Sequence, residues 1–137
     1  MIDCKMLINE AINAREYAYI PYSNFAVGAA LLTESGKIYS GCNIENASFT
    51  PTNCAERTAI FKAVSEGERN FVAIAVVGGK HGEKVSEYIT PCGVCRQVLA
   101  EFCSKDFIII SAKNETDYKE FTLKELFPGS FNKESVL

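Results

Sequence analysis

The stretch FVAIAVV at residues 71–77 decides the fold. Seven consecutive apolar residues are typical of a strand that is buried on both faces, as in a sheet with helices on either side. A second buried strand, FIIIS at 107–111, follows it, and the segment between the two, which ends near Phe102, has the composition of a helix. Thr90 and Pro91 suit the N-cap and the first position of this helix, because proline needs no hydrogen bond there. Strand, helix and strand in this order predict an α/β sheet with helices packed on its faces.

The rest of the chain extends this sheet. A helix from about Asp3 to Tyr19 comes first, with Asp3 as its N-cap and with Pro21 ending it. The further elements that the sequence predicts are a hairpin of strands 26–32 and 38–43, a helix at 54–65 closed by Gly67, a flexible glycine-rich loop at 78–82, an edge strand at 118–122 and a short helix at 123–127. No repeat, linker or low-complexity tract divides the sequence, so we expect one domain over residues 1–137.

The composition is that of a folded protein, since 47% of the 137 residues are hydrophobic and 23% are charged. The net charge is −3, from 14 basic and 17 acidic residues. Binding to nucleic acid needs clustered lysine and arginine, so we expect a small neutral substrate and no nucleic-acid partner. No apolar run approaches the roughly 18 residues that span a membrane, and the first residues do not have the layout of a signal peptide. We therefore expect no membrane partner and a cytoplasmic location.

Three of the six cysteines are placed to share a metal ion. Cys92 and Cys95 form a CxxC pair in the first turn of the helix after strand 71–77, and Cys54 opens the preceding helix. Two strand–helix junctions can lie side by side at one edge of an α/β sheet. Three thiolates would then bind one Zn²⁺ and leave its fourth tetrahedral position to water, which is typical of a catalytic site. The remaining cysteines are expected to act as small buried hydrophobes: Cys4, Cys42 and Cys103.

Two charged residues accompany Cys54. Glu56 follows two positions later, where a carboxylate can lie beside the metal without binding it, take a proton from water and pass it to a leaving nitrogen. Arg57 lies one turn into the same helix and can hydrogen-bond the ligand sulfurs. Because three thiolates leave the metal centre negatively charged, this cation and the helix N-termini would restore its electrophilicity. A Cys-Ala-Glu triplet combined with Pro-Cys-x-x-Cys is the arrangement of zinc nucleobase deaminases.

Motifs along most of the chain resemble the small, tetrameric, three-cysteine cytidine deaminases. The resemblance rests on CAER at 54–57, PCGVCRQ at 91–97, PYSNFAVGAA at 21–30, GCNIENAS at 41–48 and LFPGSF at 126–131. It implies a three-layer α/β/α fold with a mixed sheet of about five strands, one Zn²⁺ per subunit on the three cysteines, and a homotetramer whose subunits complete one another's active sites. The implied reaction is hydrolytic deamination of cytidine and 2′-deoxycytidine to uridine and 2′-deoxyuridine, with release of ammonia, in pyrimidine salvage.

The same resemblance implies a role for each site residue. Glu56 would shuttle protons and hydrogen-bond the pyrimidine ring and its amine, while the Ala55 carbonyl would accept from that amine. Asn43 and Glu45 would bind the ribose 3′-hydroxyl. Phe131 would reach the active site of a neighbouring subunit and stack on the pyrimidine. The other residues implied in substrate binding would pack against the base or complete the pocket: Phe25, Asn46, Ala47, Ser48 and Phe49.

Some features depart from the family pattern or fit other classes of protein. Phe49 stands where many relatives have tyrosine, and Ala26 where many have proline. The nearest rival is a blasticidin S deaminase-like enzyme or a deaminase of another amino-heterocycle, although the 43–47 loop favours an ordinary nucleoside. A structural zinc module would need a fourth cysteine or histidine ligand, and a CxxC redox protein would leave the Cys-Ala-Glu triplet unexplained. The single histidine, His81, fits no ligand position and is expected in an exposed loop.

Overall fold

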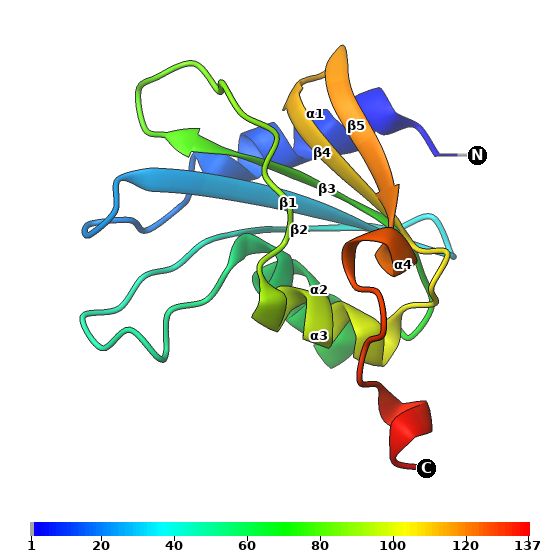
Figure 1. Cartoon of the computed structure of the whole chain (residues 1–137). Helices are drawn as coiled ribbons and strands as arrows, with labels where there is room; N and C mark the ends of the chain where they lie inside the picture. The colour runs from blue at the N-terminus through cyan, green and yellow to red at the C-terminus, as the bar shows by residue number, and fades with distance from the viewer. Residues whose placement is uncertain (1) are drawn as a thin grey trace.

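A mixed sheet of five strands forms the middle of the molecule, in the order β2-β1-β3-β4-β5 (Figure 1). The strands are β1 (Phe25–Thr33), β2 (Ile38–Cys42), β3 (Phe71–Lys80), β4 (Ile108–Asn114) and β5 (Asp117–Thr122). β3 and β4 are parallel, and the other neighbouring pairs are antiparallel. The computed structural model describes residues 2–137. It confirms the mixed α/β sheet that the two buried apolar runs predict.

Helices cover both faces of this sheet. α1 (Cys4–Arg15) packs on one face, and α2 (Ala55–Ser65) and α3 (Gly93–Phe102) lie on the other (Figure 1). Successive residues of a strand point to opposite faces, so each central strand contributes to two cores. In β3, Ile74 and Val76 belong to the core beneath α2 and α3, while the core beneath α1 takes the alternate residues Ala73, Ala75 and Val77. The fold is therefore the expected three-layer α/β/α arrangement.

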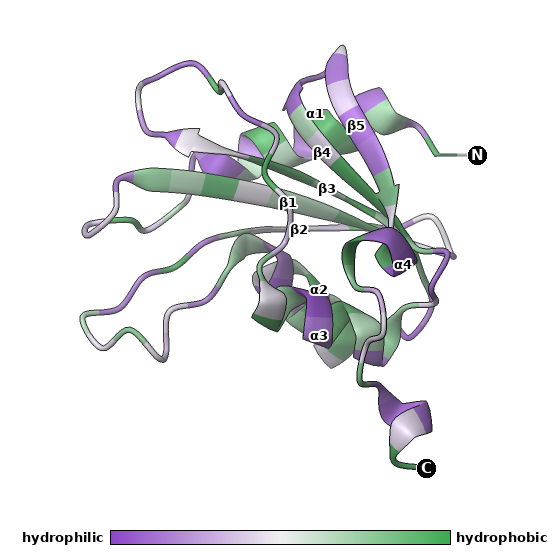
Figure 2. Ribbon diagram, in the orientation of Figure 1, coloured by the Kyte–Doolittle hydropathy of each residue, from purple (hydrophilic) through white to green (hydrophobic). Residues whose placement is uncertain are grey.

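The polarity of the strands follows their place in the sheet. β3 and β4 are hydrophobic along much of their length, whereas β5 at the edge is largely hydrophilic (Figure 2). Residues 117–120 of β5 are all exposed. Charged side chains on an exposed edge strand discourage pairing with another sheet.

Two glycines allow helices to approach the sheet closely. A Cβ atom on Gly28 would lie 1.9 Å from the backbone oxygen of Ala11 in α1. On the other face, a Cβ atom on Gly41 would lie 2.7 Å from the backbone oxygen of Ala55 in α2. Both contacts are to helix backbone, which cannot rotate away as a side chain can. The first turn of α2, which carries the Cys-Ala-Glu triplet, is therefore seated directly on β2.

Several predicted boundaries are wrong for identifiable reasons. The first helix ends at Arg15, not Tyr19, because the backbone of Tyr19 pairs with Asn43 and Glu45. β3 continues to Lys80, so the predicted glycine-rich loop lies partly inside a strand. α3 begins at Gly93 with Cys92 as its N-cap, instead of beginning at Pro91 after a Thr90 cap.

The chain ends in two short helical segments. α4 (Leu123–Leu126) is held by a capping box in which Thr122 and Glu125 bond each other's backbone N–H groups. A 3₁₀ turn, η1 (Lys133–Ser135), follows and was not predicted. Arg96 connects this region to the start of α3, since it donates to the Leu126 carbonyl and to the Pro91 carbonyl. Within residues 2–137, none of the helices has the length and apolar character that crossing a membrane requires.

Candidate active site

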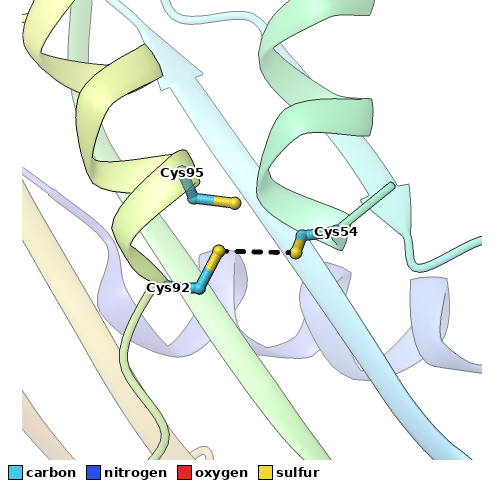
Figure 3. Close-up of side chains that lie close together, drawn as sticks. All are labelled: Cys54, Cys92 and Cys95. Atoms are coloured by element: carbon cyan, nitrogen blue, oxygen red, sulfur yellow. Dashed lines mark hydrogen bonds between the residues drawn. The ribbon is translucent and has the colours of Figure 1, made fainter. Parts of the chain in front are cut away.

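The three predicted cysteines converge where α2 and α3 begin (Figure 3). Cys54 is the N-cap of α2, Cys92 is the N-cap of α3, and Cys95 lies in the first turn of α3. Their sulfur atoms all lie within 4.8 Å of one another, and the sulfurs of Cys54 and Cys92 are 3.7 Å apart. Neither N-cap side chain bonds the backbone of its own helix. Both sulfurs are therefore free to face a common centre.

This geometry fits one zinc ion. Zinc–sulfur bonds of about 2.3 Å in a tetrahedron place two ligand sulfurs about 3.8 Å apart, close to the 3.7 Å between Cys54 and Cys92. Among residues 2–137, the cluster of potential metal ligands here contains only the three cysteines. A structural zinc site would need a fourth protein ligand, so this donor set leaves one coordination position open to a small molecule. Cys92 is exposed, which gives the site an opening to solvent.

The surroundings favour the thiolate form of Cys54. The hydrogen bond with the Cys95 thiol lowers the pKa of Cys54 to about 5, aided by Arg57 and Cys92 and opposed by burial. The same hydrogen bond, together with burial, raises the pKa of Cys95. Cys54 therefore holds the first negative charge of the cluster. The N-termini of α2 and α3 add partial positive charge beside it.

Arg57 lies beside the cysteine sulfurs. One of its terminal nitrogens donates to Cys54 Sγ at 3.4 Å. Burial acts to lower the pKa of Arg57, but the hydrogen bonds to the Cys54 and Cys95 sulfurs and the negative charge on those sulfurs together raise it. Its Nε atom is buried and has no hydrogen-bond partner among the described residues. The guanidinium thus supplies positive charge next to a cluster that becomes strongly negative when all three thiols ionise.

Glu56 lies in the first turn of α2, between Ala55 and Arg57, and only 4% of its surface is exposed. Burial raises its pKa to about 7, and the nearby Cys54 acts in the same direction. A carboxyl group with this pKa exchanges protons readily near neutral pH. It is not one of the three clustered ligands. A buried carboxyl group that is not a metal-ligand candidate thus lies in the same helical turn as Cys54.

The 43–49 loop holds a second group of predicted residues. Asn43 accepts a hydrogen bond from the backbone N–H of Val27 at 2.9 Å and donates to the Phe25 carbonyl at 2.8 Å. Glu45 Oε1 accepts from the backbone N–H groups of Tyr22 and Ser23. A hydrogen bond with the Ser23 side chain lowers the pKa of Glu45, and the two backbone bonds act in the same direction. Asn43 therefore fixes the start of β1, and Glu45 fixes the segment that leads into it. This structural role was not predicted, because it depends on which backbone groups lie opposite the loop.

A cavity of about 330 Å³ lies against this loop. It brings together three predicted residues with three that the sequence did not single out: Glu45, Asn46 and Phe49, and Tyr22, Ser23 and Thr52. The remaining predicted residues differ in their exposure. Ala47 and Ser48 are exposed, Ala55 is buried, and Phe25 is half-buried. Phe131 is 62% exposed, and its carbonyl accepts a hydrogen bond from Gln97 at 2.8 Å.

The fold and this site together define a zinc-binding α/β protein with a carboxylate next to the metal ligands. The model of the cytidine and deoxycytidylate deaminase zinc-binding region matches residues 1–111. The chain belongs to this family.

Two cytidine deaminases match this chain over nearly its whole length. A cytidine deaminase of Sporosarcina psychrophila is 52% identical over 135 residues, which cover 98% of this chain and 96% of the relative. The crystal structure of cytidine deaminase from Burkholderia pseudomallei superposes with a TM-score of 0.84 at 47% identity and covers 96% of this chain and 100% of its own. A blasticidin-S deaminase of Bacillus cereus is 33% identical over 110 residues, covering 78% of this chain and 77% of the relative. The similarity to these two cytidine deaminases is thus closer, and covers more of both chains, than the similarity to this blasticidin-S deaminase.

Proposed function

We propose that this protein is a zinc-dependent cytidine deaminase that hydrolyses cytidine and 2′-deoxycytidine to uridine and 2′-deoxyuridine and releases ammonia. One observation carries the proposal: a buried carboxylate, Glu56, lies in the same helical turn as one of three sulfurs that fit a zinc ion. A structural zinc module needs no proton-transferring carboxylate, and a CxxC redox pair leaves the third clustered cysteine, Cys54, unexplained. Family membership supports the same reaction.

The reaction needs a nucleophile and two proton transfers. Zinc, when bound by Cys54, Cys92 and Cys95, supplies Lewis-acid activation of water at neutral pH. The oxygen of that water replaces the amine at C4 of the pyrimidine, and the C4–N bond breaks. Glu56 carries one proton of the water to ring N3 and the other to the departing amine, which leaves as ammonia. Its pKa of about 7 suits a group that must both accept and donate protons.

In the described part of the chain, Asn43 and Glu45 keep a free hydrogen-bond donor and a free acceptor with which they can bind a sugar. An amide nitrogen carries two hydrogens, and Asn43 uses one of them on the Phe25 carbonyl. Glu45 uses Oε1 for backbone N–H groups, so its second oxygen remains an acceptor. We assign both side chains to the ribose 3′-hydroxyl. A sugarless base would leave these groups unpaired, so free cytosine should be a poor substrate.

Other contacts recognise the base. In this proposal the Ala55 carbonyl accepts a hydrogen bond from the exocyclic amine, and Phe25 packs against the base. The loop residues that complete the pocket in this proposal are Asn46, Ala47, Ser48 and Phe49. Because Phe49 has no hydroxyl, it contributes packing and no hydrogen bond there.

The active unit in this proposal is a homotetramer in which Phe131 stacks on the pyrimidine in a neighbouring subunit. Two large aromatic side chains that are mostly exposed support it, since Phe49 is 81% exposed and Phe131 is 62% exposed. Aromatic residues are enriched where subunits meet. We place the enzyme in the cytoplasm, where it would act in pyrimidine salvage. Its ligands in this proposal are zinc and nucleosides, and it has no nucleic-acid or membrane partner.

A substrate panel tests the reaction. Zinc-loaded protein is mixed in turn with cytidine, 2′-deoxycytidine, cytosine and blasticidin S, and loss of the ultraviolet band of each compound is followed together with ammonia release. The proposal predicts rapid turnover of the two nucleosides and little turnover of cytosine or blasticidin S. Turnover of blasticidin S alone would reassign the enzyme to the rival deaminase class, and no turnover of either nucleoside would refute the proposal.

A further inference from the structure

Thr58 lies one turn after Cys54 in α2 and is not part of the proposed metal or substrate contacts. Its hydroxyl oxygen is 3.0 Å from the Cys42 carbonyl and 3.2 Å from the Cys54 carbonyl, and it accepts a hydrogen bond from Asn53 Nδ2 at 3.1 Å. A hydroxyl has one hydrogen to donate. The Cys42 carbonyl is the nearer acceptor, and the Cys54 carbonyl already accepts the backbone N–H of Thr58 at 3.1 Å. The hydroxyl thus connects the end of β2, at Cys42, to Asn53, which directly precedes the zinc-ligand candidate Cys54.

The Cys42 carbonyl is an unusual partner, because it lies on the free edge of the sheet. The Asn43 N–H donates to the Val27 carbonyl of β1. In an antiparallel pair, the backbone N–H and C=O groups of successive residues point alternately towards the partner strand and away from it. The backbone of Cys42 and that of Ser40 therefore point away from β1. α2 covers both carbonyls, since Thr58 donates to Cys42 and Lys62 donates to Ser40.

The spacing of these two contacts matches the geometry of the two elements. Carbonyls two residues apart on a strand are separated by about 6.7 Å, and residues four apart on a helix by a rise of about 6 Å. Thr58 and Lys62 are four apart. α2 is therefore aligned along the edge of β2, with the threonine bond at the end nearest the cysteines.

The start of α2 lacks the usual means of fixing a helix N-terminus. Cys54 occupies the N-cap position, but its side chain makes no capping hydrogen bond. The residue before it is fixed instead: the N–H and carbonyl of Asn53 both bond Ile44 at 2.9 Å, and its amide donates to Thr58. Cys54 is thus held between Asn53 on one side and Thr58 on the other, and its sulfur is left for the metal.

We propose that Thr58 is a positioning residue for the metal site: its hydroxyl, bonded to Asn53 and to the Cys42 carbonyl, fixes the backbone of Cys54 and so the direction of the Cys54 sulfur. The inference rests on the proposed zinc site. Residues that orient metal ligands typically contribute ten- to hundredfold to metal affinity or activity. Loss of this hydroxyl should therefore weaken metal retention and not only the folded state.

The test compares Thr58→Val with Thr58→Ser and with Lys62→Met. Valine keeps the shape and removes the hydroxyl, serine keeps the hydroxyl, and methionine removes the other edge contact of the same helix. The measurements are the rate of zinc release to excess chelator, the thiolate-to-metal absorption bands of the Co²⁺-substituted protein, and kcat and KM for cytidine. We expect Thr58→Val to release zinc about tenfold faster, with shifted Co²⁺ bands and a kcat that falls more than KM rises. Thr58→Ser and Lys62→Met should match the unmodified protein.

Two results would overturn the inference. One is zinc release and a Co²⁺ spectrum in Thr58→Val that equal those of the unmodified protein. The other is equal damage in Thr58→Ser, which keeps the hydroxyl; the site would then respond to any change of side chain at this position and not to loss of the hydroxyl. If Thr58→Val does not fold, Asn53→Ala removes the donor to the same hydroxyl, and unchanged zinc release in that variant refutes the inference. The metal readouts need no substrate, so they remain decisive even if the proposed deaminase reaction fails.

Discussion

Gly41 in β2 offers the sharpest test of how closely the catalytic helix must sit on the sheet. A Cβ atom at this position would lie 2.6 Å from the backbone nitrogen of Ala59, 2.7 Å from the backbone oxygen of Ala55 and 2.9 Å from the Cβ of Thr58. The first two atoms belong to the helix backbone, so no side-chain rotation can relieve the contact. Gly41→Ala must therefore push α2 away from β2.

The expected size of the effect follows from these distances. Ordinary van der Waals contact begins at 3.4 Å, so the helix must retreat by roughly 0.8 Å at its closest atom, a degree of overpacking that costs about 1–3 kcal/mol. Glu56 and Cys54 lie in the turn that moves. Because a displacement of about 1 Å at a catalytic group costs about 10²-fold in rate, kcat for cytidine should fall by about that factor.

The assay pairs urea unfolding with steady-state kinetics on Gly41→Ala and on a control, Gly79→Ala. A Cβ atom on Gly79 would meet nothing closer than 3.5 Å, so the control should stay within about 0.5 kcal/mol of the unmodified protein and keep its kcat. If Gly41→Ala retains both the unfolding midpoint and kcat, α2 is not held by this contact and the reasoning is wrong. Equal losses in the two variants would also refute it.

Three further predictions concern the metal, the core and the single histidine. Cys54→Ala should lose its zinc, because two thiolates remain of three; metal analysis of the purified protein checks this, and a full complement of zinc would show that the ligand set is wrong. Ile74→Ala should lower the free energy of unfolding by about 2–5 kcal/mol, because Ile74 is fully buried beneath α2 and α3; a loss below about 1 kcal/mol in urea unfolding would contradict that packing. His81→Ala should leave zinc content and cytidine turnover unchanged, since His81 is exposed at the turn after β3; reduced zinc content would make it a ligand after all.

The sequence predicts the sheet and the cysteine cluster because both depend on strong local patterns. The apolar runs in β3 and β4 are uninterrupted, and such runs are typical of strands that are buried on both faces of a sheet. Cys54 and Cys92 each precede a helix, and the topology brings those two helix starts together (Figure 3). A site assembled from element ends in this way can be inferred before the fold is known in detail.

Boundaries fail where tertiary contacts compete with local preference. The hydroxyl of Thr90 has the chemistry of an N-cap but accepts a hydrogen bond from Arg96 instead. Gly78 suggests a flexible loop, yet it lies in β3, where a Cβ atom would come within 2.4 Å of Ile89 and 3.2 Å of Phe25. In a strand, glycine can mark a close approach of a neighbour and not flexibility.

The hydrogen bonds that hold the site are the part least accessible from the sequence. Thr58 bonds Cys42 only because Cys42 lies on the outward side of an edge strand, and that alternation depends on the pairing of β1 with β2. Asn43 bonds Phe25 and Val27 for a similar reason. No local pattern specifies which carbonyl a threonine or asparagine will reach across the fold.

The most direct test of the central claim is cytidine turnover measured on zinc-loaded Glu56→Gln, with zinc per chain determined on the same preparation. Glu66→Gln, at the C-terminal end of the same helix, is the matched control. If Glu56 carries the protons, Glu56→Gln keeps its zinc and fold and loses about 10²- to 10⁴-fold in kcat, while Glu66→Gln is unaffected. Near-normal turnover by Glu56→Gln with a full complement of zinc would contradict the assignment.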